Sequence, residues 1–220
     1  MKLFGFFRKK EKKPFRPFQL ERPGRGSFDE FLKSLRKNSL IILITGKRGS
    51  GKSALGMTLL QLLKESGRKC WVLGYEKAKL PGWIKKAENL ENLPANSAVL
   101  VDEGALAFFS RDAMKQPNKV LSKLMAIARH KDLSLILISQ SSAMIDLNVL
   151  RLADVVILKE PSLLQAKFER KAIREMYEKV EPIFKQVQER EKYAYIYSDS
   201  FEGLISFSLP DFWSERLSKA

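Results

Sequence analysis

Cysteine and histidine are almost missing from this chain of 220 residues, which has one of each, Cys70 and His130. A single cysteine excludes a disulfide framework within one chain, and its place in the apolar run Cys70-Trp-Val-Leu predicts a buried strand residue. The sequence shows no Cys/His cluster with the spacing of a zinc site and no Ser/His/Asp arrangement. We therefore expect a reducing compartment, and neither a zinc enzyme nor a triad hydrolase.

Long hydrophobic runs are missing as well. No apolar run approaches the roughly 18–20 residues that cross a bilayer. The apolar stretch Met1 to Phe7 is too short for a secretory signal, and its basic cluster follows it instead of preceding it. We expect a cytoplasmic protein, in the host-cell cytoplasm if the chain is viral, that is not secreted and has no transmembrane segment.

Acidic residues are few: the chain has 25 Asp and Glu but 40 Lys and Arg, which gives a net charge of +15. Residues 1–26 hold nine basic and two acidic residues, interspersed with phenylalanines and with prolines that disfavour helix. We interpret residues 1–26 as a flexible basic arm that becomes ordered on a partner. An excess of this size attracts polyanions, so the candidate partners are nucleic acid and an anionic membrane surface. A solvated, merely soluble surface is the alternative.

Residues 27–220 form a single domain of alternating strands and helices in this interpretation. Ser27 and Glu30 have the spacing of a capping box, which opens a helix up to residue 36. Continuous apolar runs are typical of strands covered on both faces of a parallel sheet. On this basis we expect strands at 40–45, 70–74, 98–102, 134–139 and 155–158, and helices at 53–66, 119–130 and 163–180.

The last part of the chain changes pattern. Apolar residues alternate on both sides of the turn residues that begin at Asp199, which predicts a β-hairpin over residues 193–209. The predicted fold class is therefore α/β: a three-layer P-loop NTPase fold of the RecA/FtsK kind, with a central, mainly parallel sheet and a C-terminal β-hairpin.

The predicted helix over 163–180 has two faces. The apolar stripe Leu164, Phe168, Ala172, Met176 and Val180 indicates core packing. The other face is basic, with Lys167, Arg170, Lys171, Arg174 and Lys179. We expect that face to be solvated, with DNA contact as the alternative.

A glycine-rich run between a strand and a helix carries the strongest chemical signal. In Gly46-Lys-Arg-Gly-Ser-Gly-Lys52-Ser53, glycines allow the backbone N–H groups to point inward at an anion. Lys52 is placed to reach the β- and γ-phosphates, and the Ser53 hydroxyl to hold Mg²⁺. A plain Gly-rich turn would explain neither of these two residues. The predicted nucleotide-binding residues are Gly46, Lys47, Arg48, Gly49, Ser50, Gly51, Lys52, Ser53 and Ala54.

Polar residues follow two further strands. Asp102 and Glu103 end an apolar strand, where Asp102 is suited to the hydration shell of Mg²⁺ and Glu103 to orienting the water that attacks the γ-phosphate. Gln140 ends the strand at 134–139, at the sheet edge that faces the ligand in such folds. We predict that Gln140 contacts the γ-phosphate or the attacking water. The alternative for Asp102 and Glu103 is a surface turn, and the alternative for Gln140 is an ordinary loop amide.

Arg129 lies at the end of the helix predicted at 119–130. A cation there stabilises the helix dipole, and this is the structural explanation. The catalytic explanation is that Arg129 is an arginine finger, which acts on the phosphates bound by a neighbouring subunit. Arg151 is a weaker candidate for the same role.

Together, GKRGSGKS, VLVDE and ARHKDLSLILISQ followed by RLADVVIL resemble the FtsK/HerA superfamily of DNA-pumping ATPases, over residues 38–160. The sequence is most similar to its small viral genome-packaging and zonula-occludens-toxin-like branches. The resemblance implies a homo-oligomeric ring, a pentamer or hexamer, that hydrolyses ATP with Mg²⁺ and moves double-stranded DNA. It also implies Lys52 and Ser53 at phosphate and metal, Asp102 and Glu103 at metal and water, Gln140 as sensor and Arg129 as finger.

Two other functions stay open at this point. The first is an ATPase for assembly or export of a virus or filament, which acts on protein at a membrane surface and docks a capsid or membrane-associated protein through residues 1–26. The second is a small-molecule kinase, which the missing Arg-rich lid pattern disfavours. DNA-stimulated hydrolysis would distinguish these functions from a DNA motor.

Overall fold

We describe a computed structural model of the chain, in which residues 15–76, 78–102, 105, 117–139, 145, 147–161, 171–214 and 217 are described. No helix in these ranges is both long and apolar enough to span a bilayer.

A nine-stranded sheet in the order β1-β9-β8-β7-β2-β6-β5-β3-β4 organises the fold. Six neighbouring strands are parallel: β7 (Val155–Leu158), β2 (Ile41–Thr45), β6 (Ser134–Ser139), β5 (Ser97–Val101), β3 (Lys69–Leu73) and β4 (Ile84–Lys86). The hairpin β8 (Tyr193–Ser198) and β9 (Phe201–Phe207) continues the sheet antiparallel to β7, and β1 (Phe18–Gly26) pairs antiparallel with β9. The predicted parallel sheet with a C-terminal hairpin is confirmed.

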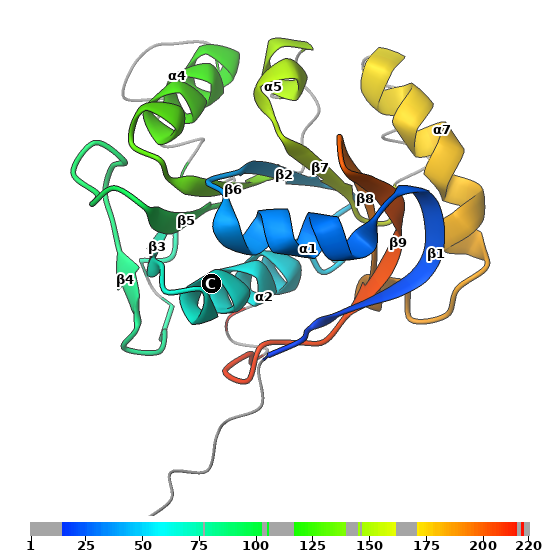
Figure 1. Cartoon of the computed structure of the whole chain (residues 1–220), viewed down its shortest axis with the longest axis horizontal. Coiled ribbons are helices and arrows are strands. Elements are labelled where there is room, and N and C mark those ends of the chain that lie inside the picture. Colours follow the sequence, from blue (N-terminus) through cyan, green and yellow to red (C-terminus); the bar gives the residue numbers. More distant parts are fainter. Residues whose placement is uncertain are drawn as a thin grey trace, which may run out of the picture.

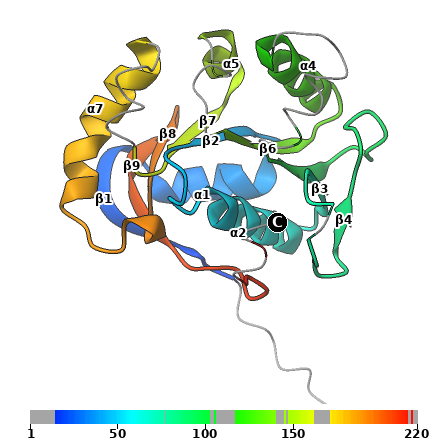
Figure 2. The same ribbon diagram turned by 180° about the vertical axis from the view of Figure 1, so that it is seen from behind.

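Helices cover both faces of the sheet, which makes three layers (Figure 1). On one face lie α1 (Phe28–Lys37) and α2 (Lys52–Glu65); on the other lie α4 (Pro117–His130), α5 (Leu147–Leu152) and α7 (Lys171–Lys185), as the reverse view in Figure 2 also shows. Strand β2 serves both layers: Ile42 and Ile44 pack in the core on the α2 side, and Ile41 and Leu43 in the core on the other side. This explains why the central strands are apolar without alternation.

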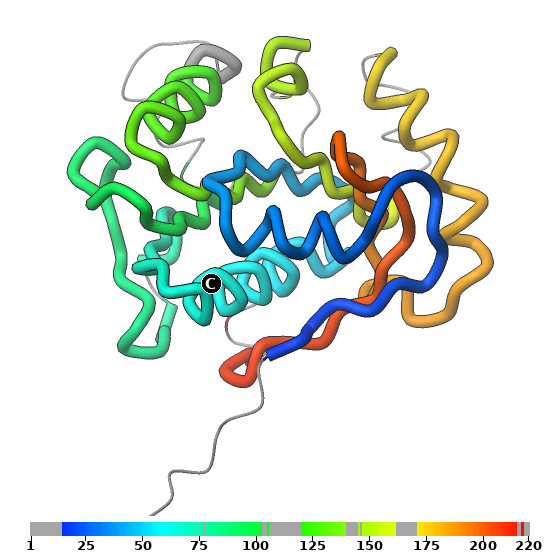
Figure 3. Tube along the Cα trace, in the orientation of Figure 1, coloured from blue at the N-terminus to red at the C-terminus, as the bar shows by residue number. Residues whose placement is uncertain are grey.

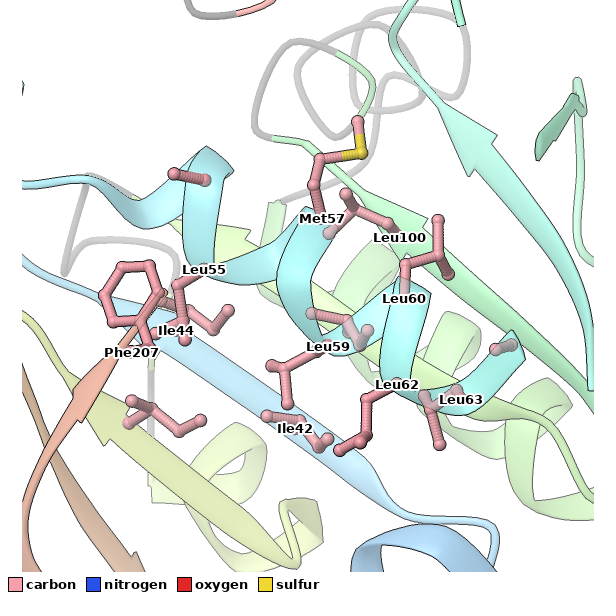
Figure 4. Packing of buried hydrophobic residues seen from close by; sticks show 14 of the residues in the cluster. Ile42, Ile44, Leu55, Met57, Leu59, Leu60, Leu62, Leu63, Leu100 and Phe207 are labelled. Carbon is pink, nitrogen blue, oxygen red and sulfur yellow. The ribbon is translucent and has the colours of Figure 1, made fainter. Parts of the chain in front are cut away.

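Helix α2 is almost entirely buried. Leu55, Leu59 and Leu62 point toward Ile42 and Ile44 of β2, and Met57 and Leu60 lie toward Leu100 of β5 (Figure 4). Gly56 brings the helix close to the sheet, because a Cβ at this position would lie 2.8 Å from Leu100 Cδ1. This packing fixes the start of α2, and with it the loop that precedes the helix.

The N-cap of α1 agrees with the predicted capping box in part. Ser27 Oγ accepts a hydrogen bond from the Glu30 backbone N–H at 3.3 Å. The backbone N–H of Ser27 donates to the Ser200 carbonyl in the hairpin turn at 3.0 Å, so α1 is joined to the hairpin instead of closing the box on itself.

The first strand differs from the prediction that residues 1–26 are a flexible arm. Residues Phe18–Gly26 form β1 and pair with β9 along its whole length, while residues 1–14 lie outside the described residues. The hydropathy pattern misses β1 because it is an edge strand in which only Phe18 is buried. Pro23 is tolerated there, next to a register shift, because an edge strand has backbone positions without a ladder partner.

Three other elements differ from prediction. The short elements β4 and α5 lie in segments for which neither a strand nor a helix was predicted. Helix α7 ends at Lys185 instead of residue 180, with Pro182 inside it. Its buried face is Ile173, Tyr177, Val180 and Phe184, so the predicted stripe is displaced and Ala172 and Met176 lie at its border; Leu164 and Phe168 lie outside the described residues.

Candidate nucleotide-binding site

The loop between β2 and α2 has the backbone of an anion cradle. Gly46, Gly49 and Gly51 have φ angles of 150°, 76° and 86°, a region that residues with a Cβ rarely adopt. Nothing lies within 4 Å of the Cβ position of Gly49, whereas a Cβ on Gly51 would lie 2.8 Å from the Glu191 carbonyl oxygen. The loop is therefore open at its middle and closely supported at its end.

Two polar side chains of this loop are buried. The Lys52 ammonium donates to the carbonyls of Gly46 and Lys47 at 2.9 and 2.8 Å, which holds it across the loop at the start of α2. Ser50 is 2% exposed, and its Oγ has no hydrogen-bond partner among the described residues. A buried hydroxyl without a partner is costly, and this one lies in the loop between Gly49 and Gly51, which both line the pocket.

Residues after β7 support the loop from behind. Lys159 is fully buried, donates to the carbonyls of Glu191 and Tyr193, and lies 4.5 Å from the ring centre of Phe207. A Cβ on Gly46 would lie 2.7 Å from Lys159 Cβ, so the loop begins in direct contact with this lysine.

Glu160 extends the same support. Its carboxylate pairs with Lys47 at 2.7 Å and with Arg190 at 2.8 Å, and its carbonyl accepts from the Lys47 N–H at 3.0 Å. Both cations favour the ionised carboxylate, and they hold the pKa of Glu160 below its usual value although burial opposes them. The 3₁₀ turn Arg190–Lys192 is thereby tied to the start of the phosphate loop.

Asp102 follows β5 and lines the same pocket as Ser53. Its backbone N–H donates to the Leu73 carbonyl at 3.3 Å, which joins the exits of β5 and β3. The buried Tyr75 lies beyond the exit of β3; burial, then the Asp102 carboxylate, raises the pKa of Tyr75 well above its usual value, while Ser53 acts in the opposite direction. Ser53, Asp102 and Tyr75 therefore lie together.

A pocket of about 1030 Å³ opens over the phosphate loop. Its volume is that of a site for a whole small-molecule ligand. One wall is the loop and Asp102; the other combines the 3₁₀ turn, both hairpin strands and both ends of the described chain. This second wall is lined by Pro17, Gln19, Glu191, Lys192, Tyr193, Ser206, Phe207, Ser208, Leu209, Trp213 and Leu217.

The two ends of the described chain meet beside this pocket, where the start of β1 lies next to the segment that follows β9 (Figure 3). The segment after β9 is held along α2: Gln61 and Asp211 exchange two hydrogen bonds, at 3.0 and 3.3 Å. Phe212 packs edge-on against Trp83, with ring centres 5.3 Å apart.

The predicted nucleotide-binding residues Gly46 to Ala54 are contiguous and form the loop and the first turn of α2, with Arg48, Gly49, Gly51, Lys52, Ser53 and Ala54 on the pocket surface. Asp102 faces the same pocket. Glu103 and Gln140 lie outside the described residues. Strand β6, which ends at the residue before Gln140, lies between β2 and β5 in the sheet.

Arg129 does not lie with these residues. It is at the C-terminal end of α4, at the edge where the parallel strands begin, whereas the phosphate loop is at the edge where they end. Its guanidinium donates to Asp154 Oδ1 at 2.7 Å and to the Leu152 carbonyl at 3.2 Å, and Asp154 Oδ2 accepts from the Ile41 N–H. Arg151 is exposed on α5.

Sequence reasoning missed Tyr75, Lys159 and the hairpin wall of the pocket. Tyr75 and Lys159 each follow a predicted strand at the same edge as the phosphate loop, and this position was the available signal. The contribution of Phe207 and Trp213 had no local signal, because it depends on the sheet order.

The residues present fit a nucleoside triphosphate with Mg²⁺. The loop supplies an open, glycine-lined cradle, a buried cation and a buried hydroxyl without a partner among the described residues. Ser53 and Asp102 line the same pocket, and a hydroxyl and a carboxylate are the kind of oxygen ligands that Mg²⁺ takes from a protein when phosphates and water complete its shell.

No protein-family model matches the sequence, and no curated protein sequence matches it. Solved structures do match. The genome packaging NTPase B204 from Sulfolobus turreted icosahedral virus 2, in complex with AMPPCP, is 18% identical with a TM-score of 0.54, over 78% of this chain and 99% of that chain.

Two longer proteins match as well. The pCW3 conjugation coupling protein TcpA with ATPgS has a TM-score of 0.58 at 15% identity, over 84% of this chain and 65% of that one. EssC (ATPases 2 and 3) from Geobacillus thermodenitrificans has a TM-score of 0.50 at 12% identity, over 94% of this chain and 50% of that one. The chain thus shares the fold of these ATPases, and the P-loop NTPase fold predicted from its motifs is confirmed.

Proposed function

We propose that the protein is a Mg²⁺-dependent ATPase that moves double-stranded DNA as an oligomeric ring, in viral genome packaging. The observation that best supports ATPase activity is the open glycine cradle, with the buried Lys52, on the same pocket as Asp102. Support for packaging comes from the match to a genome packaging NTPase over nearly the whole of that chain.

In this proposal the loop N–H groups and Lys52 bind the phosphates, and Ser53 and Asp102 hold Mg²⁺, which neutralises phosphate charge when bound. Glu103 orients and activates the attacking water, and Gln140 contacts the γ-phosphate or that water. The second wall of the pocket, with Tyr193, Phe207 and Trp213, encloses the base and sugar.

Double-stranded DNA is the proposed substrate because of the net charge of +15. Residues 1–14 alone carry six basic residues and one acidic residue, so they are the segment that we assign to DNA contact. Two lysines of the α7 face are ion-paired, Lys171 with Glu175 and Lys179 with Glu202. This pairing favours a solvated face for α7.

The test is ATP hydrolysis with and without duplex DNA at low salt, with Mg²⁺ present. We expect duplex DNA to stimulate hydrolysis, Lys52→Ala to lose nucleotide binding, and Glu103→Gln to bind ATP without cleaving it. Glu91→Gln is the matched control, because Glu91 is an exposed carboxylate paired with Lys123. Hydrolysis that ignores DNA but responds to anionic vesicles would instead favour the assembly or export ATPase at a membrane surface. Wild-type turnover by Glu103→Gln would remove Glu103 from the mechanism.

A further inference from the structure

A tyrosine hydroxyl lies buried beside the two groups to which we assign the metal. Strands β3 and β5 are parallel neighbours in register, with Leu73 opposite Val101. Past the strand ends, Gly74 takes a φ of 87° and leaves only 3.0 Å between its Cβ position and Ala105 Cβ. The two exits are packed against each other, which brings Tyr75 next to Asp102.

The Tyr75 side chain is buried, and two polar side chains lie near its hydroxyl. Its side chain is 2% exposed, and its hydroxyl has no hydrogen bond of normal geometry among the described residues. Asp102 and Ser53 lie on its polar side: Asp102 follows the strand next to β3, and Ala54, the residue after Ser53, belongs to the same core cluster as Tyr75. Both side chains also act on the pKa of Tyr75. Packing alone would be served better by phenylalanine, because a buried hydroxyl without a partner is destabilising.

The hydrogen-bonding capacity of a phenol matches what these neighbours need. A serine whose oxygen binds Mg²⁺ still has a proton to donate, and a carboxylate accepts only. One phenol can accept from the Ser53 hydroxyl and donate to an Asp102 oxygen at the same time. Groups that hold metal ligands in this way commonly set metal affinity.

We propose that Tyr75 is a positioning residue of the metal site, whose hydroxyl links Ser53 to Asp102 and sets their separation and orientation for Mg²⁺. This inference rests on the proposed function, in which Ser53 and Asp102 hold the metal. Tyr75 itself touches neither metal nor nucleotide.

The test compares Tyr75→Phe with Tyr197→Phe. Tyr197 of β8 also has a buried hydroxyl without a hydrogen-bond partner among the described residues, so it controls for the loss of such a group. Binding of a non-hydrolysable ATP analogue is measured by calorimetry over a series of Mg²⁺ concentrations. We expect Tyr75→Phe to keep its metal-free affinity and to need about 10–100-fold more Mg²⁺ for the metal-dependent gain. Tyr197→Phe is expected to match wild type.

Three outcomes would separate the possible explanations. A Mg²⁺ requirement for Tyr75→Phe within threefold of wild type overturns the positioning role. Asp102→Asn with an unchanged Mg²⁺ requirement overturns the metal assignment itself, independently of Tyr75. If Tyr75→Phe lowers the melting temperature, the double variant with Asp102→Asn decides: a positioning role predicts no further loss of Mg²⁺ dependence, whereas independent structural damage predicts additive losses.

Discussion

Lys159 is fully buried, and its ammonium lies between two backbone carbonyls and the ring of Phe207. Burial, with nearby Lys52 adding to it, lowers the pKa of Lys159 to about 7, while Glu191 and Glu160 oppose the shift. A neutral amine still has two N–H groups for the two carbonyls. The contact with the phosphate loop can thus persist when the charge is lost.

This lowered pKa predicts a pH-dependent stability. Between pH 7 and 8.5 the folded state binds fewer protons at Lys159 than the unfolded state, so this group makes the free energy of unfolding rise with pH, by at most about 1.4 kcal/mol per pH unit. Denaturant unfolding across this range should show a smaller rise for Lys159→Met than for wild type. The exposed, ion-paired Lys179 supplies the control, Lys179→Met. Equal slopes for Lys159→Met and wild type would contradict the shift.

Gly51 combines an unusual backbone angle with a close neighbour. Gly51→Ala places a Cβ at a φ of 86° and 2.8 Å from the Glu191 carbonyl oxygen. Gly67→Ala, with a φ of 89° and nothing within 4 Å, measures the backbone strain alone. We expect Gly67→Ala to cost about 1–2 kcal/mol in unfolding free energy. Gly51→Ala should lower the unfolding free energy more and should also weaken nucleotide binding. Equal losses of unfolding free energy for the two variants would show that the 3₁₀ turn moves away from the new Cβ at no cost.

At the scale of elements, β1 joins the N-terminal segment to the site. It pairs with β9, and the ends of both strands line the pocket. Its pairing also covers an edge of the hairpin that would otherwise expose unpaired backbone groups.

Truncation at two positions tests this role. Removal of residues 1–14 should leave the melting temperature within a few degrees of wild type and weaken duplex DNA binding, with a shallower salt dependence. Removal of residues 1–26 also deletes β1, and it should lower the melting temperature clearly and weaken nucleotide binding. Two truncations with the same melting temperature would mean that β1 adds no stability in solution.

The elements that could be predicted from sequence are those with local signals. The five central strands are mainly apolar, the phosphate loop has its glycines, and α1 has its N-cap serine. Strand β1 could not be predicted, because its stability comes from hydrogen bonds to a strand more than 170 residues away. For the same reason Asp102 was expected at the phosphate site, while Tyr75, Lys159 and Trp213 were not: their partners are set by sheet order and loop packing.

At the scale of the whole molecule, Arg129 is the residue that tests the proposed ring, because the resemblance implies that it acts as an arginine finger on a neighbouring subunit. Its ion pair with Asp154 is at the sheet edge opposite to the phosphate loop of the same chain. A role in catalysis therefore requires the site of a neighbouring subunit, whereas a structural role requires only Asp154.

Mixing of inactive subunits distinguishes these roles. Arg129→Ala and Glu103→Gln subunits, each inactive alone, should recover part of the ATPase activity together if Arg129 acts between subunits. Asp154→Asn is the control: a structural role predicts similar stability losses for Asp154→Asn and Arg129→Ala with activity kept per folded molecule. Mixed oligomers without recovered activity would return Arg129 to that structural role.

The wall formed by the C-terminal segment has an optical consequence. The chain has three tryptophans, of which Trp213 lines the pocket and Trp71 and Trp83 do not. Nucleotide that fills the pocket should change the intrinsic fluorescence of Trp213, so the protein carries its own reporter of occupancy. Trp213→Phe should abolish the change, and Trp71→Phe should keep it.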